Sequence, residues 1–288
     1  MTHATSTHTK VAVILVNWNG REVTLDCLRS LRAVRSHALH VLVVDNASTD
    51  GSVEAIQLNF PEAEILQQSS NLRFAGGNNA GIKRALELNA EYILLLNNDT
   101  IVDPSVVQAL VGRMDADQQC GMVAPKIYYY DRPEVLWFAG AKVSFWTGTM
   151  RHIGIREVDS GQHDRARETD YATGCCTLVR SSVVRAVGVL DESYFMYGED
   201  ADWSMRVKRA GYTVWYEPKG KVWHRLSVSA GGHLSAFKLR NKLISSYRFF
   251  SRYAKWYHWL TWPWMIGVVN LIVALRFRLG TARASSRT

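Results

Sequence analysis

Short apolar runs alternate with segments of helical periodicity through the first hundred residues of the chain. The runs occupy 11–16, 41–44 and 93–96, and a further strand is expected at 64–67. Those at 11–16 and 93–96 are apolar throughout, which is typical of strands buried on both faces. Between the first two runs, Leu25, Leu28 and Leu31 share one face, which indicates an amphipathic helix. This alternation predicts an α/β fold with a parallel sheet covered by helices.

The same reasoning extends to the rest of the chain. Further helices are expected at 52–59, 82–88, 105–114, 182–188 and 201–210, and further strands at 122–127, 171–180 and 213–216. Residues 144–170 are polar and weakly periodic. A segment of that length inside a compact domain predicts a functional or mobile loop.

Polar residues follow each buried run at the point where it ends. Asn17 ends the first run, Asp45 follows the second, and Asn97, Asn98 and Asp99 follow the last. Because ligands of open α/β sheets bind beyond the carboxyl ends of the strands, Asp99 is a candidate to hold a divalent cation on a phosphate. The alternative is that these residues only form a turn and cap the helix near Pro104. Local pattern leaves both interpretations open.

The segment 71–81 is rich in glycine. Gly76, Gly77 and Gly81 fit neither the GxGxxG dinucleotide fingerprint nor a P-loop. They would still let the backbone approach a sugar or diphosphate closely. A plain turn at the start of a helix is the other interpretation.

Three carboxylates, Glu199, Asp200 and Asp202, crowd the start of a predicted helix directly after Gly198. Acidic residues are favoured there by the helix dipole, so capping alone explains them. Since Glu199 and Asp200 are adjacent and point in different directions, one could cap while the other faces a cleft as a general base. His224 stands alone, and a lone histidine is more often structural than a ligand.

Composition and charge bound the class of protein. The 288 residues are 47% apolar, enough for one large or two small domains with a core. Thirteen of the 34 Lys and Arg residues lie after residue 217, where no Asp or Glu occurs, although the whole chain carries only +8. Such asymmetry indicates a polyanion or an anionic membrane as the partner of the C-terminal part.

The cysteines and the N-terminus carry less information. Cys27, Cys120, Cys175 and Cys176 form no CxxC or zinc-ligand spacing, which is typical of reduced, cytosolic proteins. Residues 1–10 are polar and lack the apolar core of a signal peptide, so we expect a flexible tail.

Seven motifs together resemble the family 2 inverting glycosyltransferases of the GT-A fold, especially bacterial rhamnosyltransferase-like members. In the family's order they are VILVNWNG (13–20), VVDNASTDGS (43–52), NLRFAGGNNAGI (71–82), LLLNNDT (94–100), TGCCTLVRSSVV (173–184), GVLDESYFMYGEDADWSMRVKRAGYTVWYEP (188–218) and VWH (222–224). Each motif alone is weak, but seven in the right order are highly specific. They cover roughly residues 10 to 250. The resemblance implies an α/β GT-A domain over 11–235, with a mixed, mostly parallel sheet flanked by helices.

The resemblance assigns roles to single residues. Asp45 would accept a hydrogen bond from the base of a nucleotide-sugar. Asp99 matches the last residue of the metal-binding DxD motif, and His224 matches a histidine that completes the site for Mg²⁺ or Mn²⁺ in some members. Asp200 matches the base that deprotonates the acceptor hydroxyl, with Glu199 in a supporting role. The other residues expected to bind the donor are Asn17, Arg73, Gly76, Gly77, Asn78 and Asn98.

The chain also departs from the family pattern. Arg73 stands where the family commonly has glycine, and Asn97 replaces the first carboxylate of the DxD motif. The QxxRW motif and the several membrane helices of processive synthases are absent. This favours an enzyme that adds a single sugar.

The region 236–288 predicts a basic, amphipathic helical extension. Leu239, Leu243, Tyr247, Phe250, Ala254 and Tyr257 form an apolar stripe with basic residues largely opposite. Four tryptophans lie in the segment 256–275, where Pro263 argues against one straight helix. An interfacial or re-entrant membrane anchor is favoured over a homo-oligomer contact or core helix, and over a true span, because the uninterrupted apolar run is short. Nucleic-acid binding is not expected, since no recognition motif is present.

These observations lead to one functional hypothesis and one alternative. The hypothesis is a metal-dependent inverting glycosyltransferase that moves one sugar, with rhamnose from dTDP-rhamnose as a candidate, to a polyprenyl-diphosphate-linked or cell-surface glycan. It would be cytoplasmic and peripheral on the inner face of the cell membrane. The alternative is a non-catalytic nucleotide-sugar-binding or scaffold protein of a glycan assembly complex.

Overall fold

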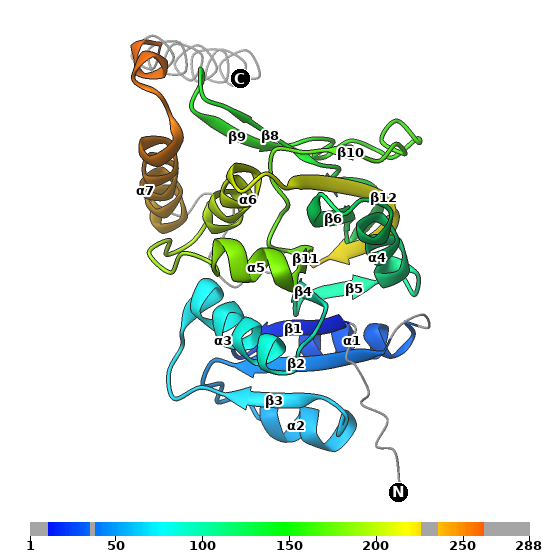
Figure 1. Ribbon diagram of the computed structural model, residues 1–288. Helices are drawn as coiled ribbons and strands as arrows, with labels where there is room; N and C mark the ends of the chain where they lie inside the picture. The colour runs from blue at the N-terminus through cyan, green and yellow to red at the C-terminus, as the bar shows by residue number, and fades with distance from the viewer. Residues whose placement is uncertain (1–10, 35–37, 226–235, 262–288) are drawn as a thin grey trace, which may run out of the picture.

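The computed structural model describes residues 11–34, 38–225 and 236–261. Within these ranges ten strands form one mixed sheet in the order β10-β12-β6-β11-β4-β1-β2-β3, with β5 paired to β12 and β7 to β6. The strands of this sheet are β1 (Val11–Asn17), β2 (Leu39–Asp45), β3 (Glu64–Gln67), β4 (Tyr92–Asn97), β5 (Thr100–Val102), β6 (Cys120–Tyr129), β7 (Arg132–Phe138), β10 (Arg167–Glu168), β11 (Cys176–Arg180) and β12 (Thr213–His224). Figure 1 shows β1, β2 and β3 in its lower part and β6, β11 and β12 in its upper part.

Helices and one hairpin complete the described fold. The helices are α1 (Arg21–Arg32), α2 (Ser52–Asn59), α3 (Arg73–Glu87), α4 (Val106–Ala116), α5 (Ser181–Val187), α6 (Glu199–Arg209), α7 (Ala236–Tyr253) and the 3-10 helix η1 (Trp256–Leu260). The hairpin pairs β8 (Ala141–Ser144) with β9 (Thr149–His152). Together with β10 it gives the segment 144–170 more regular structure than its polar sequence predicts.

The predicted parallel sheet is confirmed in the N-terminal half. Strands β4, β1, β2 and β3 are all parallel neighbours, and residues 93–96 of β4 are at most 2% exposed. Complete burial of such side chains stabilises the fold by about 2 kcal/mol each. The four buried cysteines are free thiols, as expected from their spacing.

The glycine-rich segment is helical, not a turn. We expected a helix only from residue 82, but α3 begins at Arg73. A Cβ atom at Gly77 would lie 2.8 Å from Val16 Cγ1, and one at Gly81 would lie 2.5 Å from Ile14 Cγ2. The glycines therefore allow α3 to pack closely on β1, and this packing outweighs their low helix propensity.

The C-terminal half makes the sheet mixed. Strand β11 is antiparallel to both β4 and β6, and it begins at Cys176 instead of Tyr171 because residues 171–175 form a loop. Strand β12 runs on to His224, well beyond the predicted 213–216. Pro218 and Gly220 lie within its register irregularity between Glu217 and Lys221, which lets the strand continue past them.

Helix α7 lies beside α6 at the edge of the molecule (Figure 1). Its buried face carries Ser245, Phe249, Phe250 and Tyr253, whereas Leu243 and Tyr247 of the predicted apolar stripe are 62% and 65% exposed. The helix is amphipathic as predicted, but Phe250 of the predicted stripe is buried while Leu243 and Tyr247 are exposed, so packing on the body covers a face that overlaps the predicted stripe only in part. Among the described residues, no helix combines the length and apolar character that a membrane crossing requires. The expected tail 1–10 and most of the segment 256–275 lie outside the described residues.

Candidate functional site

The carboxyl ends of the parallel strands bring the polar turns together. Strand register places Asn17 beside Asp45 and Val16 beside Asn97. Asn17 Nδ2 donates to Asp45 Oδ1 at 2.8 Å, and the backbone amide of Ser48 donates to Asp45 Oδ2 at 2.9 Å. Both Asn17 and Asp45 are buried. The Asp45 carboxylate is thus held in one orientation at the end of β2.

Asn98 belongs to the same network. Its Nδ2 donates to Thr24 Oγ1 at 2.8 Å and lies 3.2 Å from Asn17 Oδ1, which also accepts from Thr24 Oγ1 at 2.9 Å. Thr24 and Ser48 were missed from sequence because a threonine inside a helix and a serine in a turn carry no distinctive pattern. The network joins three of the predicted donor and metal turns into one rigid base.

Asp99 and His224 meet at the end of this network. His224 Nε2 lies 3.1 Å from Asp99 Oδ1, although the two residues are far apart in sequence. The antiparallel pairing of β5 with β12 causes this, since it sets His224 opposite Thr100 and lets the Arg225 amide donate to the Asp99 carbonyl at 2.8 Å. Trp137 packs edge-on against the His224 ring at 4.8 Å.

Asp99 and His224 offer part of the ligand set that a divalent cation needs. Asp99 Oδ1 and His224 Nδ1 are enclosed and form no hydrogen bond within the described structure. A buried carboxylate oxygen without a hydrogen bond, beside an imidazole, is the type of site a hard cation occupies. Asn97 Nδ2 lies 3.5 Å from His224 Nε2, where the family's first DxD carboxylate would stand. No group of three or more acidic, His or Cys ligands occurs in the described ranges, so phosphate oxygens and water would complete the coordination.

Glu199 and Asp200 begin α6. Asp200 Oδ2 accepts from the Gly174 amide at 3.1 Å and its Oδ1 from the Ala201 amide at 2.8 Å. Glu199 Oε2 is enclosed and has no hydrogen-bond partner among the described residues. Burial and the neighbouring Asp200 carboxylate raise the pKa of Glu199 to about 8, and burial raises the pKa of Asp200 too. Adjacent carboxylates with raised pKa values suit proton transfer near neutral pH.

Residues 174 and 175 join the start of α6 to the end of β4. Gly174 binds Asp200 through its amide, and the Cys175 carbonyl accepts from the Asn97 amide at 2.8 Å. A Cβ atom at Gly174 would lie 2.9 Å from the Phe74 ring and 3.7 Å from Asp200 Cβ, so any larger residue would have to displace the Phe74 side chain. The TGCC motif is the sequence signal for this contact, but nothing in it reveals the packing partner.

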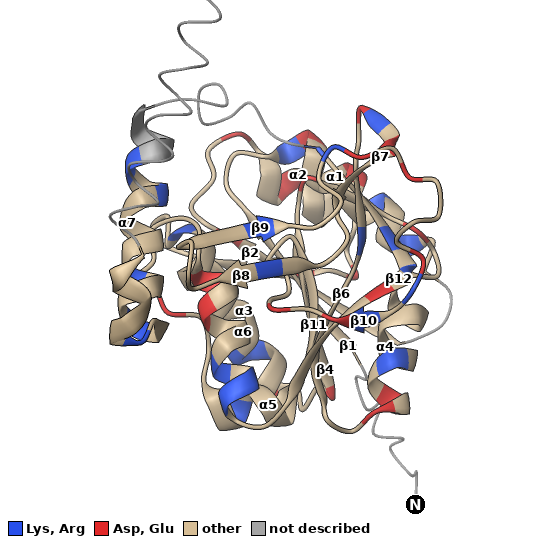
Figure 2. Ribbon diagram, turned by 90° about the horizontal axis from the view of Figure 1, so that it is seen from above, with Lys and Arg blue, Asp and Glu red and all other residues tan. Residues whose placement is uncertain are grey.

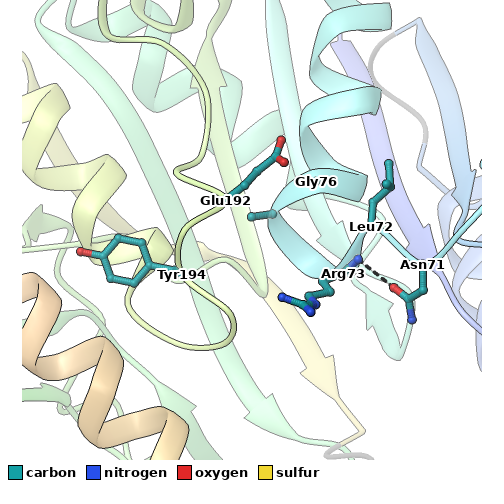
Figure 3. Close-up of a pocket in the computed structure, with 7 residues that line it drawn as sticks. Asn71, Leu72, Arg73, Gly76, Glu192 and Tyr194 are labelled. Carbon is teal, nitrogen blue, oxygen red and sulfur yellow. Dashed lines mark hydrogen bonds between the residues drawn. The ribbon is translucent and has the colours of Figure 1, made fainter.

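Arg73 and Gly76 line a separate 220 Å³ pocket with Glu192 and Tyr194. Figure 3 shows Glu192 above Gly76 and Arg73 below it. Arg73 has a left-handed backbone, with φ of 63°, held by donation of its amide to Asn71 Oδ1 at 2.7 Å. A glycine would adopt this left-handed conformation without strain, whereas an arginine adopts it at a cost. The Arg73 guanidinium stacks over the Phe195 ring at 4.0 Å, which offsets part of the strain.

Gly77 and Asn78 face the core. Gly77 lies against Val16 and Asn46, and Asn78 Nδ2 donates to the Phe74 carbonyl within the same helix at 2.9 Å. Both residues are buried. Packing accounts for them, and their predicted contact with a donor stays a prediction.

Comparisons with known proteins place this site in a family. The profile of glycosyl transferase family 2 matches residues 12–188. The N-acetylglucosaminyl-diphospho-decaprenol L-rhamnosyltransferase of Mycobacterium tuberculosis is 27% identical over 232 residues, which cover 73% of this chain and 75% of that protein. The low-salt glycan biosynthesis hexosyltransferase Agl10 of Haloferax volcanii is 26% identical over 249 residues, covering 84% and 77%.

Solved structures show the same fold. GalNAc-T7 with UDP, GalNAc and Mn²⁺ superposes with a TM-score of 0.66 at 15% identity, covering 82% of this chain and 47% of that one. The mannosyltransferase PcManGT from Pyrobaculum calidifontis with GDP-Man and Mn²⁺ gives 0.62 at 16% identity, covering 85% and 65%. This chain therefore spans less than two-thirds of either. The resemblance inferred from the seven motifs is confirmed: the chain belongs to glycosyl transferase family 2 and adopts the GT-A fold of its structural neighbours.

Proposed function

We propose that this glycosyltransferase moves one sugar, with inversion, from a nucleotide-sugar to a glycan acceptor. The observation that carries the proposal is the pair of carboxylate groups at one end of the sheet. Asp99 with His224 forms one group and Glu199 with Asp200 forms the other. Residues 174–175 connect Asp200 to the end of β4 at Asn97, two residues before Asp99. The first suits the departing phosphate and the second suits the attacking hydroxyl.

The donor would lie over the rigid base of Asn17, Asp45 and Asn98. The Asp45 carboxylate, oriented by Asn17 and Ser48, would accept a hydrogen bond from the nucleotide base. A divalent cation, Mg²⁺ or Mn²⁺, held by Asp99 and His224 would offset the charge that grows on the leaving nucleoside diphosphate. Two protein ligands are few, but diphosphate oxygens commonly supply the rest for such ions.

The acceptor would meet the other carboxylates. Asp200 accepts two backbone hydrogen bonds, so its side chain is already oriented before a substrate arrives. It would remove the proton of the acceptor hydroxyl as that oxygen attacks the anomeric carbon from the face opposite the diphosphate. One displacement of this kind inverts the configuration. Glu199 would support it by holding a proton near neutral pH.

The relatives suggest which substrates to test first. The mycobacterial relative is named as a rhamnosyltransferase acting on a decaprenol diphosphate, and the haloarchaeal one as a hexosyltransferase of glycan biosynthesis. We therefore infer dTDP-rhamnose as a candidate donor and a polyprenyl-diphosphate-linked or cell-surface glycan as the acceptor class.

An anionic membrane surface fits the C-terminal region of the chain. On α7 and η1, the side chains of Leu243, Tyr247, Trp256 and Leu260 are 62% to 75% exposed. Figure 2 shows basic positions spaced along α7 at one end of the molecule. Exposed apolar and basic side chains together suit a lipid surface, which would present a lipid-linked acceptor. The protein would then act at the inner face of the cell membrane.

One variant separates transfer from binding. Asp200→Asn should abolish sugar transfer, by about 10²-fold or more, because the amide cannot take the proton. Binding of the nucleotide-sugar, measured by calorimetry with Mn²⁺, should persist. Asp131→Asn, at an exposed position, is the matched control. Normal turnover by Asp200→Asn would remove Asp200 from the mechanism.

The alternative of a non-catalytic scaffold makes a different prediction. It predicts nucleotide-sugar binding with neither transfer nor donor hydrolysis by the wild type. Activity with Mg²⁺ or Mn²⁺ that EDTA abolishes would exclude it. Screening a panel of nucleotide-sugars with a soluble acceptor analogue makes this comparison directly.

A further inference from the structure

A buried carboxylate on α6 holds the C-terminal helix α7 in place. Asp202 is completely buried in the first turn of α6. Its Oδ1 accepts from Arg252 Nη1 at 2.7 Å and from the Tyr253 hydroxyl at 2.7 Å, both on α7. Its Oδ2 accepts from Arg206 Nε at 2.9 Å. Charge-assisted hydrogen bonds to an enclosed carboxylate are among the strongest contacts between elements.

The same face of α7 also braces the loop that leads into α6. Arg252 Nη1 lies 2.9 Å from Asp191 Oδ2, and Ser245 Oγ donates to the Met196 carbonyl at 2.8 Å. Arg248 donates to the Ser193 carbonyl. The loop 191–198 is therefore held at several points along its length by a helix that follows it by some fifty residues.

Asp202 lies two residues beyond Asp200 in the same helical turn. The amide of Asp202 donates to the Gly198 carbonyl at 2.9 Å, so the turn that carries Glu199 and Asp200 is closed by this residue. Gly198 has φ of 90°, a left-handed conformation that glycine adopts without strain, so the chain turns sharply into α6 at this residue. Without Arg252 and Tyr253, the buried Asp202 would retain Arg206 alone as a side-chain donor among the residues that the structure describes. We expect the turn to loosen in that case, because an underpaired buried carboxylate is costly.

We propose that Arg252 and Tyr253 are positioning residues, which hold the first turn of α6 through Asp202 and thereby orient Asp200 for catalysis. The proposal rests on the function assigned above to Asp200. It gives α7 a role inside the active site, with its inner face ordering the acceptor side while its outer face stays free. Since Tyr253 also packs against Phe249 and Arg209, its ring can stay in place when only the hydroxyl is removed.

The test uses the full chain with three test substitutions and one control substitution. Arg252→Met and Tyr253→Phe remove one donor each, and Arg252→Lys keeps the charge. Arg240→Met, exposed and roughly 18 Å earlier along the same helix at 1.5 Å per residue, removes an equal charge as the control. The first measurement is steady-state transfer to a soluble acceptor analogue. The second is hydrogen exchange of peptides covering 198–203, with 39–59 as the internal reference.

Specific results are expected. In Arg252→Met, kcat should fall at least about fivefold while the donor KM stays within about twofold, since small displacements of a catalytic group cost rate and not donor binding. Arg252→Lys should recover part of the loss, and Tyr253→Phe should lie between. Exchange at 198–203 should quicken in the same order. Arg240→Met should match the wild type in both measurements.

Other results would overturn the positioning role. Unchanged exchange at 198–203 in folded Arg252→Met would do so, as would an equal loss of donor binding and kcat. If the wild type transferred no sugar, the proposed function would fail, while exchange would still decide the positioning role: faster exchange at 198–203 supports it and unchanged exchange refutes it.

Discussion

Proton binding at Glu199 makes the unfolding free energy of this protein fall as the pH rises toward about 8. An isolated glutamate has a pKa of 4.5, and burial beside Asp200 raises the pKa of Glu199 to about 8 in the folded state. Between these values the folded protein keeps a proton that the unfolded chain has released. The stabilising contribution is therefore complete below pH 4.5 and is lost as the pH rises through about 8. Glu199→Gln, which cannot ionise, should remove this loss.

The size of the effect is worked out over a pH range in which His152 no longer changes the unfolding free energy. His152 acts in the opposite direction, because burial lowers its pKa from 6.5 to about 4, so its contribution is complete above pH 6.5. Between pH 6.5 and pH 8, one proton at 1.36 kcal/mol per unit costs the wild type about 2 kcal/mol of unfolding free energy. Asp200, with its pKa also raised, adds loss of the same sign in both proteins. The difference between the wild type and Glu199→Gln therefore reports Glu199 together with the change that the loss of its charge causes at the adjacent Asp200.

Urea unfolding followed by tryptophan fluorescence measures this difference. We expect Glu199→Gln to gain about 2 kcal/mol on the wild type between pH 6.5 and pH 8, with the same m-value. Glu22→Gln, whose side chain is 76% exposed, should follow the wild type throughout. Parallel pH profiles for the wild type and Glu199→Gln would refute the raised pKa and, with it, the role of Glu199 as a proton holder near neutral pH.

Three further predictions concern the packing, the metal and the membrane. Gly81→Ala should destabilise the protein by about 1–2 kcal/mol, because its Cβ would overlap Ile14 and the cost of overpacking exceeds the gain in helix propensity. Gly112→Ala, with open space around it, should stabilise the protein by about 0.5–1 kcal/mol in the same urea assay. Equal effects of the two substitutions would contradict the packing argument. Asp99→Asn should weaken Mn²⁺ binding in the presence of a nucleoside diphosphate by at least about tenfold, measured by calorimetry. Asp103→Asn should leave the Mn²⁺ affinity unchanged. An unaltered Mn²⁺ affinity of Asp99→Asn would exclude Asp99 as a ligand. Tyr247→Glu combined with Trp256→Glu should reduce sedimentation with vesicles rich in anionic lipid, whereas Leu58→Glu, at an even more exposed position on α2, should not. Full sedimentation of the double variant would place the lipid contact elsewhere.

Much of the fold follows from local pattern. Apolar runs located the buried strands β1, β2 and β4, because burial on both faces leaves a continuous signal in the sequence. The strand ends carried Asn17, Asp45 and Asp99 to one edge, as parallel neighbours must. Motif order then identified the family, although each motif alone was ambiguous.

Other features depend on contacts between distant segments, which local pattern does not record. The glycines of α3 are typical of a turn in sequence, but they lie in a helix because Val16 and Ile14 on β1 leave no room for a Cβ atom at Gly77 and Gly81. The buried face of α7 could not be chosen by periodicity, since apolar residues occupy more than one side and only packing on α6 decides which is covered.

The site itself divides in the same way. Residue types and motif order marked Asp99, Asp200 and His224 as candidates, because each carries the chemistry that its role needs. Their meeting is a tertiary fact: strand β5 pairs with β12 to set His224 3.1 Å from Asp99, and the 174–175 loop ties Asp200 to the end of β4. Contacts between residues a hundred positions apart are selected by the packing of the whole sheet, whereas the chemistry of each side chain depends on the residue type at that position.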